Sequence, residues 1–222
     1  VEAFSVADFD AFDVANFNRQ AGAFVSTLGQ PKVDVMCEIA RDINPGVAIT
    51  SFPGGIDEGN VDDFLKDVNV YVDGLDYFAF STRRLLYRKL EQKKIPAVIA
   101  APLGMGVALV NILPGEMTFE EYFRLDGHSE EDQAILFLLG LSPSMLQMNY
   151  LVDRSFVDFR NRKGPSTAMA CQLCAGFAAT EALKIILHRG HVKGAPWGMH
   201  FDAYRCKFKR TWRPWGNRNP VQ

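Results

Sequence analysis

Cysteine is scarce in this sequence, and its few positions fit neither a disulfide framework nor a zinc site. The 222 residues include 4 cysteines. Cys37 and Cys206 stand alone, and Cys171 with Cys174 forms one C-x-x-C pair inside an apolar segment. A structural zinc ion needs four ligands, which one pair cannot supply. We therefore expect a buried helical pair, no zinc site and, because no disulfide pattern is present, a cytoplasmic protein.

An excess of charge and an uninterrupted apolar run are also missing. The formal net charge is -2, which gives no general electrostatic reason to bind nucleic acid or an anionic membrane. The longest apolar stretch, residues 95–113, is interrupted by Pro96, Pro102, Gly104 and Gly106. Such a stretch favours two buried strands over a membrane-spanning helix. No signal peptide is expected either, so the sequence predicts neither a nucleic-acid partner nor a membrane partner.

Apolar segments of strand type and amphipathic segments of helix type alternate in the first half, with short connections. This alternation predicts a parallel sheet covered by helices. The expected fold class is therefore α/β, with a Rossmann-like, doubly wound and mainly parallel sheet. The expected strands are residues 1–7, 47–52, 68–72, 95–101 and 106–113, the expected helices are residues 31–43, 57–66 and 78–93, and a terminal antiparallel strand pair is expected at 198–204 and 206–212.

The second half has a different composition. Residues 117–163 are rich in phenylalanine and tyrosine on helix-like pieces, which indicates a helical insertion that covers part of the sheet. Residues 167–187 predict a long, buried helix. The tail from Trp215 is polar, and we expect it to be loose. A single domain is thus expected over residues 1–222, with 117–163 as its insertion.

Two acids, Asp8 and Asp10, directly follow the first expected strand. In nucleotide-binding sheets an acid at such a strand end often hydrogen-bonds the ribose hydroxyls. The alternative is an ordinary strand-end turn, for which aspartate is also favoured. Together with the polar residues that follow, the pattern favours the ribose role, and it favours Asp8 for it.

A cluster of amides and one arginine comes next, at Asn16, Asn18, Arg19 and Gln20. The planar guanidinium of Arg19 suits phosphate oxygens, and the amides add neutral donors and acceptors. An amide-rich loop that caps a helix is the alternative. Lys32 lies in the first turn of an expected helix, where the helix dipole disfavours a cation. An anionic partner such as a polyphosphate is therefore favoured over a solvated lysine.

Two further acids, Asp73 and Asp76, follow the strand expected at 68–72. They stand at the carboxyl edge of the sheet, where open α/β folds bind ligands. One carboxylate there could hold a magnesium ion that bridges phosphates. The alternative role is to cap the next helix, for which aspartate is well suited. Two acids leave room for both roles.

The order of these motifs resembles one protein family. D-x-D at 8–10, N-x-N-R-Q at 16–20 and G-Q-P-K at 29–32 resemble the ThiF/MoeB/HesA adenylyltransferases, bacterial relatives of ubiquitin-activating enzymes. Segments 71–76 and 169–184 resemble that family's D-x-x-D strand end and its late helix. The resemblance implies that ATP and the free C-terminal carboxylate of a ubiquitin-like protein or peptide react to give an acyl-adenylate and pyrophosphate. It also implies a homodimer.

The resemblance assigns roles to individual residues. Asp8 would hold the ribose and Asp76 the magnesium ion. The phosphates would be held by Asn16, Arg19 and Lys32, and Gln20 would support the same loop. Catalysis would then rest on positioning and charge neutralisation by Arg19, Lys32 and Asp76. The complete expected ATP site consists of Asp8, Asp10, Asn16, Asn18, Arg19, Gln20, Lys32 and Asp73, together with Asp76 as the Mg²⁺ ligand.

Three features of that family are missing from the sequence. Its glycine-rich phosphate loop would precede Val1, so we expect this polypeptide alone to bind ATP poorly, with the loop either cut off or supplied by another chain. The family's paired zinc cysteines are missing where residues 117–163 stand. Residues 161–167 lack the cysteine that thioester-forming members carry, so the reaction is expected to stop at the adenylate.

Two other functions stay open at this point. A NAD(P)-binding oxidoreductase would also use an acid such as Asp8, but it has no use for Arg19 or Lys32, and no catalytic tyrosine or histidine stands out. A non-catalytic nucleotide-binding module of the same fold would explain the missing loop and the missing cysteines. Titrations with ATP and with NADH separate the adenylyltransferase from the oxidoreductase, and a complete protein that binds no ATP would favour the non-catalytic module.

Overall fold

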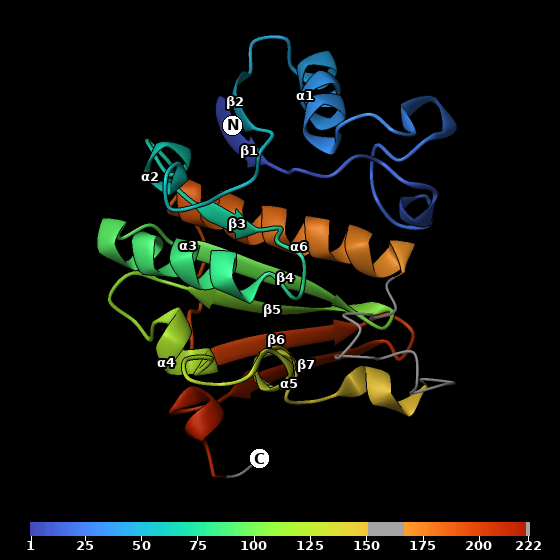
Figure 1. The fold of residues 1–222 in the computed structure, drawn as a ribbon. Helices are drawn as coiled ribbons and strands as arrows, with labels where there is room; N and C mark the ends of the chain where they lie inside the picture. Colours follow the sequence, from blue (N-terminus) through green and yellow to red (C-terminus); the bar gives the residue numbers. More distant parts are fainter. Residues whose placement is uncertain (151–166, 221–222) are drawn as a thin grey trace. The chain divides into compact units, whose positions relative to one another are not determined.

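The computed structural model describes residues 1–150 and 167–220 of the chain. It consists of two compact units, Val1–Val68 and Asn69–Gln222 (Figure 1). The first unit has a two-stranded sheet and the second has a five-stranded sheet. Together they give the α/β class that the sequence predicts.

The first unit is a parallel strand pair joined by a helix. Strand β1 (Ala3–Ala7) pairs with β2 (Ala48–Phe52), and the register runs from Ala3 opposite Ala48 to Ala7 opposite Phe52. Between them lie the short 3₁₀ helices η1 (Val14–Asn16) and η2 (Val25–Thr27), then α1 (Lys32–Ile43). The short helix α2 (Val61–Phe64) follows β2. A small core of Phe12, Ala23 and Val35 fixes the loop between β1 and α1 against that helix.

The sheet of the second unit is mixed. Its strands lie in the order β3 (Tyr71–Asp73), β4 (Ala97–Leu103), β5 (Gly106–Ile112), β6 (Trp197–Asp202) and β7 (Lys207–Trp212). The β3–β4 pair is parallel, and the three other pairs are antiparallel.

The antiparallel part of this sheet begins earlier than the C-terminal strand pair that the sequence predicts. Leu103 of β4 pairs with Gly106 of β5, so only Gly104 and Met105 connect the two strands. Gly104 has a φ of +60°, a conformation that glycine adopts without strain. A connection this short can join only antiparallel neighbours, because a parallel crossover needs a dozen or more residues.

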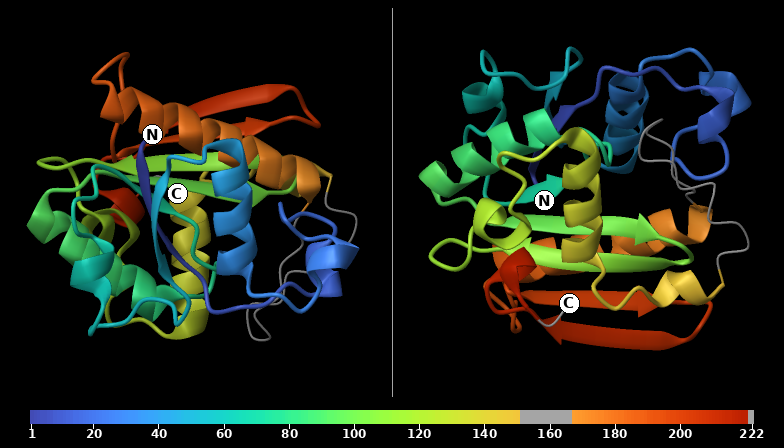
Figure 2. Two further views of the ribbon diagram at one scale, coloured as in Figure 1. Left: turned by 90° about the horizontal axis from the view of Figure 1, so that it is seen from above. Right: turned by 60° about the horizontal axis from the view of Figure 1, so that its bottom comes forward.

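Helices cover both faces of the five-stranded sheet. Helix α6 (Ala168–Ile186) packs on β4 and β5, whereas α3 (Phe80–Lys93), α4 (Phe119–Phe123) and α5 (Glu130–Leu141) belong to the other side. The two views of Figure 2 place α5 and α6 on opposite faces. Under α6 the core contains Val98, Leu109 and Ala178, with Phe177 and Met199 packed around them.

Helix α6 is buried on one face only, which corrects the expectation of a buried helix. Its buried residues are Ala170, Cys174, Ala178 and Glu181, while Leu183 is 52% exposed. The helix is long and apolar enough to cross a membrane by length and composition. One of its faces nevertheless packs on the sheet, as a core-covering helix does. The C-x-x-C pair lies here as expected, and burial raises the pKa of the Cys174 thiol to about 12.

The expected insertion is helical where the structure describes it. Helices α4 and α5 and the 3₁₀ helix η3 (Leu146–Asn149) lie in its first part. Residues 151–163, with Phe156 and Phe159, lie outside the described residues. Residues 161–166, the greater part of the stretch expected to lack a nucleophilic cysteine, also lie outside them.

The described part of the C-terminal tail, residues 215–220, is not loose, contrary to the prediction from its polarity. Asn217 Nδ2 donates to the carbonyl oxygens of Phe123 at 2.7 Å and Leu136 at 2.8 Å. Arg213 Nη1 donates to Leu139 O at 2.8 Å, and residues Gly216–Arg218 form the 3₁₀ helix η5. The polar side chains that suggested a solvated tail instead bind backbone carbonyls of α4 and α5.

Candidate functional site

The polar residues of the first unit surround the end of β1. Asp8 Oδ1 accepts from the backbone N–H of Asp10 at 2.8 Å, which makes a local aspartate turn. Lys32 Nζ donates to Asp10 Oδ2 at 2.8 Å, and the Lys32 N–H donates to Asp10 O at 2.9 Å. Side-chain exposure is 12% for Lys32 and 53% for Asp10. The ion pair is thus open to solvent from the side of the carboxylate.

The amide cluster follows a capping pattern. Asn16 is buried, and its Oδ1 accepts from the N–H of Asp13 at 3.0 Å. Asp13 Oδ1 in turn accepts from Ala15 N at 2.9 Å, so the two side chains cap η1 reciprocally. The amide oxygen of Asn16 therefore has the capping role that the sequence left open as an alternative.

Arg19 is held by neutral groups. Its Nη1 donates to Ala15 O at 2.7 Å and to Asn18 Oδ1 at 2.9 Å. No carboxylate pairs with this guanidinium in the part of the chain that the structure describes. Asn18 is exposed and Gln20 is half-buried, beside Arg19. The guanidinium of this half-buried arginine is therefore available to an anionic ligand.

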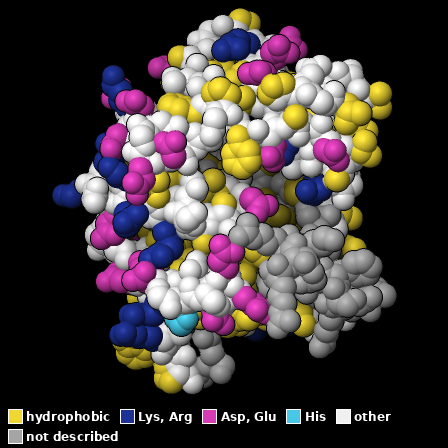
Figure 3. Space-filling model, in the orientation of Figure 1, with side chains coloured by type: hydrophobic (Ala, Val, Ile, Leu, Met, Phe, Trp, Pro, Cys, Tyr) yellow, Lys and Arg dark blue, Asp and Glu magenta, His cyan; other side chains and the backbone are white. Residues whose placement is uncertain are grey.

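Exposed apolar side chains accompany this polar loop. Phe9 is 78% exposed, Phe24 60% and Val25 84%. The space-filling view shows hydrophobic side chains at the surface of the upper part of the molecule as drawn, among charged ones (Figure 3). The loop between β1 and α1 therefore presents both charged and apolar groups to its surroundings.

Asp73, at the end of β3, lies in a buried ion pair. Arg83 Nε donates to Asp73 Oδ2 at 2.9 Å, and side-chain exposure is 3% for Arg83 and 2% for Asp73. Leu75 N donates to Asp73 Oδ1 at 3.1 Å, and the Tyr87 hydroxyl donates to Oδ2 at 3.3 Å. Burial raises the pKa of Tyr87 and the neighbouring Asp73 charge raises it further, so the phenol stays a donor. Both carboxylate oxygens are thus occupied by protein donors.

Arg83 is the buried partner that holds Asp73 in place, and the sequence did not identify it. Its guanidinium also donates to the carbonyl oxygens of Leu75 at 3.1 Å, Asp76 at 3.0 Å and Tyr77 at 3.1 Å. Burial alone would lower the pKa of Arg83, but the Asp73 carboxylate outweighs it and raises the pKa. The arginine therefore fixes the loop after β3. The sequence gives no signal for this role, because the burial of Arg83 depends on residues such as Phe137 that are distant in the sequence.

Asp76 differs from Asp73 in exposure and in its partners. Its side chain is exposed, and Oδ1 accepts from Phe78 N at 2.9 Å in a turn that precedes α3. Oδ2 has no protein donor in the described residues, so one oxygen is available to a cation. Magnesium is typically bound through one or two carboxylates together with phosphate oxygens and water. Asp76 therefore fits a magnesium ligand, whereas the oxygens of Asp73 are already used.

The predicted ATP-site residues are divided between the two units. Arg19 and Lys32 belong to the first unit, and Asp73 and Asp76 belong to the second. Within each unit the geometry agrees with the strand-end placement that the sequence predicts. The convergence of the two sets on one nucleotide stays a prediction.

A buried histidine lies in a polar cluster of the second unit. His200 Nδ1 lies 2.9 Å from Ser142 Oγ and 3.0 Å from Ser144 Oγ. Its Nε2 is buried and has no partner among the described residues. Burial lowers the pKa of His200, and the Asp202 carboxylate offsets only part of this effect. The imidazole is therefore neutral in the folded protein near pH 7.

Relatives by sequence include several enzymes. The chain is 27% identical to the molybdopterin-synthase adenylyltransferase of Escherichia coli K12 over 211 residues. This alignment covers 92% of this chain and 71% of that protein. Over 101 residues the chain is 34% identical to protein HesA of Leptolyngbya boryana, covering 46% and 36%. Over 83 residues it is 34% identical to the tRNA threonylcarbamoyladenosine dehydratase of Bacillus subtilis, covering 37% and 30%.

Solved structures of the same fold are also similar. E. coli MccB in complex with MccA matches with a TM-score of 0.69 at 15% identity, over 100% of this chain and 58% of MccB. PaaA matches with a TM-score of 0.65 at 13% identity, over 95% of this chain and 56% of PaaA. The chain thus spans little more than half of these two proteins. The profile of the ThiF family matches residues 1–220, and the chain belongs to the ThiF family.

Proposed function

We propose that this chain is the adenylyl-transfer part of an ATP-dependent enzyme that activates the C-terminal carboxylate of a small protein or peptide. The observation that carries the proposal is the ThiF family match over residues 1–220. Two similar proteins indicate which reaction the proposal should name. One sequence relative is named a molybdopterin-synthase adenylyltransferase, and the structural neighbour MccB has been solved with ATP and with MccA.

The charged residues of the first unit support the phosphate-binding half of the proposal. Arg19 has no acidic partner in the described residues, and Lys32 pairs only with the half-exposed Asp10. An exposed ion pair contributes about 0–1 kcal/mol to stability, so phosphate oxygens can replace Asp10 as the partner of Lys32 at little cost. Arg19 would offer its remaining N–H groups to the same phosphates. Asp8 would hold the ribose from the end of β1.

The chemistry requires no protein nucleophile. An oxygen of the acceptor carboxylate attacks the α-phosphorus of ATP, the bond to the β-phosphate oxygen breaks, and pyrophosphate leaves with its electron pair. Arg19 and Lys32 would hold the phosphates in line and offset the charge that develops on the leaving group. Asp76 would hold Mg²⁺ through Oδ2, and a bound Mg²⁺ supplies further neutralisation of that charge.

The test measures nucleotide binding and the exchange reaction separately, with the full-length protein. Calorimetry with ATP and Mg²⁺ is expected to give saturable binding, and NADH is expected to give none. Isotope exchange from pyrophosphate into ATP is then followed with a library of peptides that carry free C-terminal carboxylates. The same peptides with C-terminal amides are the control, because an amide cannot attack as a carboxylate does.

Site variants decide the residue assignments. Arg19→Ala and Asp76→Asn are expected to abolish exchange, whereas Arg41→Ala, an exposed arginine of α1, is the matched control that keeps it. Full exchange in both site variants would remove the assignments of Arg19 and Asp76. Binding of NADH in place of ATP would favour an oxidoreductase. Nucleotide binding without exchange on any acceptor would favour a non-catalytic module.

A further inference from the structure

The second unit has an open pocket that the proposed reaction does not use. Its lining begins three residues after the end of β5, at residues Gly115–Met117, and its volume is about 630 Å³. Ile112 at the end of β5 pairs with Ala97 at the start of β4, so the pocket belongs to the edge where β3 and β4 begin. Asp76 follows the opposite, carboxyl end of β3. A volume of this size is in the range of small-molecule sites.

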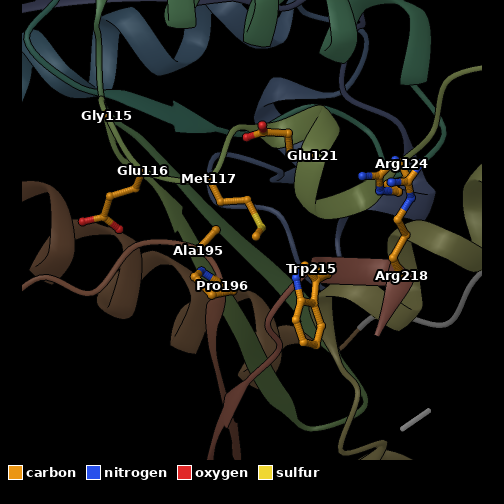
Figure 4. A pocket seen from close by; sticks show the side chains of 9 residues that line it. All are labelled: Gly115, Glu116, Met117, Glu121, Arg124, Ala195, Pro196, Trp215 and Arg218. Carbon is orange, nitrogen blue, oxygen red and sulfur yellow. The ribbon is translucent and has the colours of Figure 1, made fainter. Parts of the chain in front are cut away.

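Two arginines supply the positive charge of this pocket. Arg124 ends α4 and Arg218 lies in η5, and both side chains line the pocket. Figure 4 shows both guanidinium groups on the same side of the pocket, opposite Glu116. Neither forms an ion pair with a carboxylate in the described part of the chain, and Arg124 Nε is buried without an acceptor there. Two like charges held on one side of a pocket favour an anion between them.

The apolar wall of the pocket is Trp215, whose side chain is 64% exposed. Its backbone is in the left-handed region at a φ of +66°, which is unfavourable for a bulky residue. The next residue, Gly216, has no room for a side chain, because a Cβ there would lie 2.3 Å from Tyr122 O. Close packing of this segment on α4 therefore holds the indole at the pocket rather than in the interior. Met117 and Pro196 complete the apolar lining.

The acids of the pocket limit the charge of its ligand. Glu116 and Glu121 also line it, so the formal charges of the lining balance. Glu121 Oε2 already accepts from Thr118 N at 2.8 Å, in the cap of α4. Glu116 lies on the far side of the pocket from the two arginines (Figure 4). The two guanidinium groups attract an anion locally, but the pocket as a whole has no large positive field. A ligand with a single negative charge therefore fits better than a polyphosphate.

We propose that this pocket binds a small aromatic carboxylate, with the carboxylate between Arg124 and Arg218 and the ring against Trp215. The planar guanidinium forks match the two oxygens of a carboxylate. A flat ring gains contact area on the exposed indole, which then loses unfavourable exposure to water. The site lies apart from the residues proposed to hold ATP within the same unit, so its occupancy is independent of the adenylyl-transfer proposal.

The test compares four small probes on the full-length protein by calorimetry, with tryptophan fluorescence as a second signal. Benzoate carries the ring and one charge, benzamide the ring alone, acetate the charge alone, and phenyl phosphate the ring with a more highly charged group. Benzoate is expected to bind with a dissociation constant on the order of 1 mM, as its size allows. The three other probes are expected to bind at least about tenfold more weakly.

Substitutions of the lining residues then test whether benzoate binds in this pocket. Arg218→Gln removes the charge of an exposed residue and keeps a polar side chain there, so it is expected to fold and to weaken benzoate binding at least about tenfold. Trp215→Leu is expected to weaken benzoate while leaving acetate unchanged. Arg210→Gln, at an exposed arginine of β7, is the control that keeps wild-type affinity. Arg124→Gln is expected to match Arg218→Gln, with Arg124→Lys in its place if the glutamine variant does not fold.

Several results would overturn the proposal. Equal binding of benzamide and benzoate would remove the role of the charge, and tighter binding of phenyl phosphate would remove the carboxylate preference. Unchanged affinity for benzoate in Arg218→Gln would place the binding elsewhere. Absence of saturable benzoate binding by the wild-type protein would refute the site itself.

Discussion

The two units place an acid and a basic residue in the same local arrangement, and they use it in opposite ways. In the first unit, Asp10 follows β1 and pairs with Lys32 on α1 at 2.8 Å. In the second, Asp73 ends β3 and pairs with Arg83 on α3 at 2.9 Å. Exposure separates the two, because the side chains are 53% and 12% exposed in the first pair but 2% and 3% in the second.

Burial decides what each pair can do. Taking two charges out of water costs several kcal/mol for each ion, and good geometry with additional hydrogen bonds must offset that cost. Arg83 meets this requirement, since it donates to three backbone carbonyls and its guanidinium lies 4.7 Å from the ring centre of Phe137. The Asp10–Lys32 pair has no comparable network. The buried pair therefore serves the architecture, and the exposed pair is free to change partners.

The largest effect is expected for Arg83→Leu. This change leaves the Asp73 carboxylate buried without its cation and frees three carbonyl groups, so the free energy of unfolding is expected to fall by about 3–5 kcal/mol. Urea unfolding followed by tryptophan fluorescence measures it, because all 3 tryptophans lie in the second unit. A loss below about 1 kcal/mol would show that the Asp73–Arg83 pair is not structural.

A matched change in the exposed pair is expected to act on ligand binding. Lys32→Gln removes the ammonium that we propose to meet the phosphates, so the affinity for ATP with Mg²⁺ is expected to fall about tenfold, or about 1.4 kcal/mol. Calorimetry on the full-length protein measures it. Arg83→Lys is the comparison variant, since it keeps the buried charge and lies outside the phosphate site. An unchanged affinity in Lys32→Gln would make this lysine a surface residue.

The difference in burial between the Asp10–Lys32 and Asp73–Arg83 pairs could not be predicted from sequence alone. The strand-end positions of Asp10 and Asp73 are visible, because each follows a short apolar segment. The helices that carry Lys32 and Arg83 are also visible from their periodicity. The burial of each ion pair is not visible in the sequence, because it depends on residues that are distant in the sequence. Phe137 covers Arg83 only after α5 has packed on the sheet, and nothing in the sequence near Arg83 specifies that contact.

The C-terminal segment illustrates the same limit. Its polarity favours a solvated tail, yet Asn217 binds backbone carbonyls 94 and 81 residues away in the sequence. Side-chain donors that bind backbone acceptors leave no periodic pattern. The pocket beside Trp215 could not be predicted from the sequence either, because its lining comes from segments that are far apart in the sequence. The family motifs, in contrast, are local and ordered along the chain, so the sequence was sufficient to identify the family.

A smaller effect is expected from pH, and it belongs to the buried groups of the second unit. The pKa of His200 is lowered in the folded state, so below about pH 6.5 the unfolded chain binds a proton that the folded chain does not. Its contribution to stability is present above that pH and is lost as the pH falls toward the folded-state pKa. The slope between pH 6.5 and pH 5 is expected to be at most about 1.4 kcal/mol per pH unit. His200→Gln is expected to flatten it, and an equal slope in both proteins would exclude His200 as its source.

The smallest effect is expected for Asp10→Asn, which removes the charge of the exposed pair and retains the shape of the side chain. Because solvent screens this pair, the free energy of unfolding is expected to change by less than about 1 kcal/mol, and the difference should shrink further in high salt. Far-UV circular dichroism in urea is the suitable measurement, because tryptophan fluorescence reports only on the second unit. A loss near that expected for Arg83→Leu would mean that the Asp10–Lys32 pair also holds the fold together. Lys32 would then be committed to Asp10, and exchange of this partner for a phosphate would no longer be inexpensive.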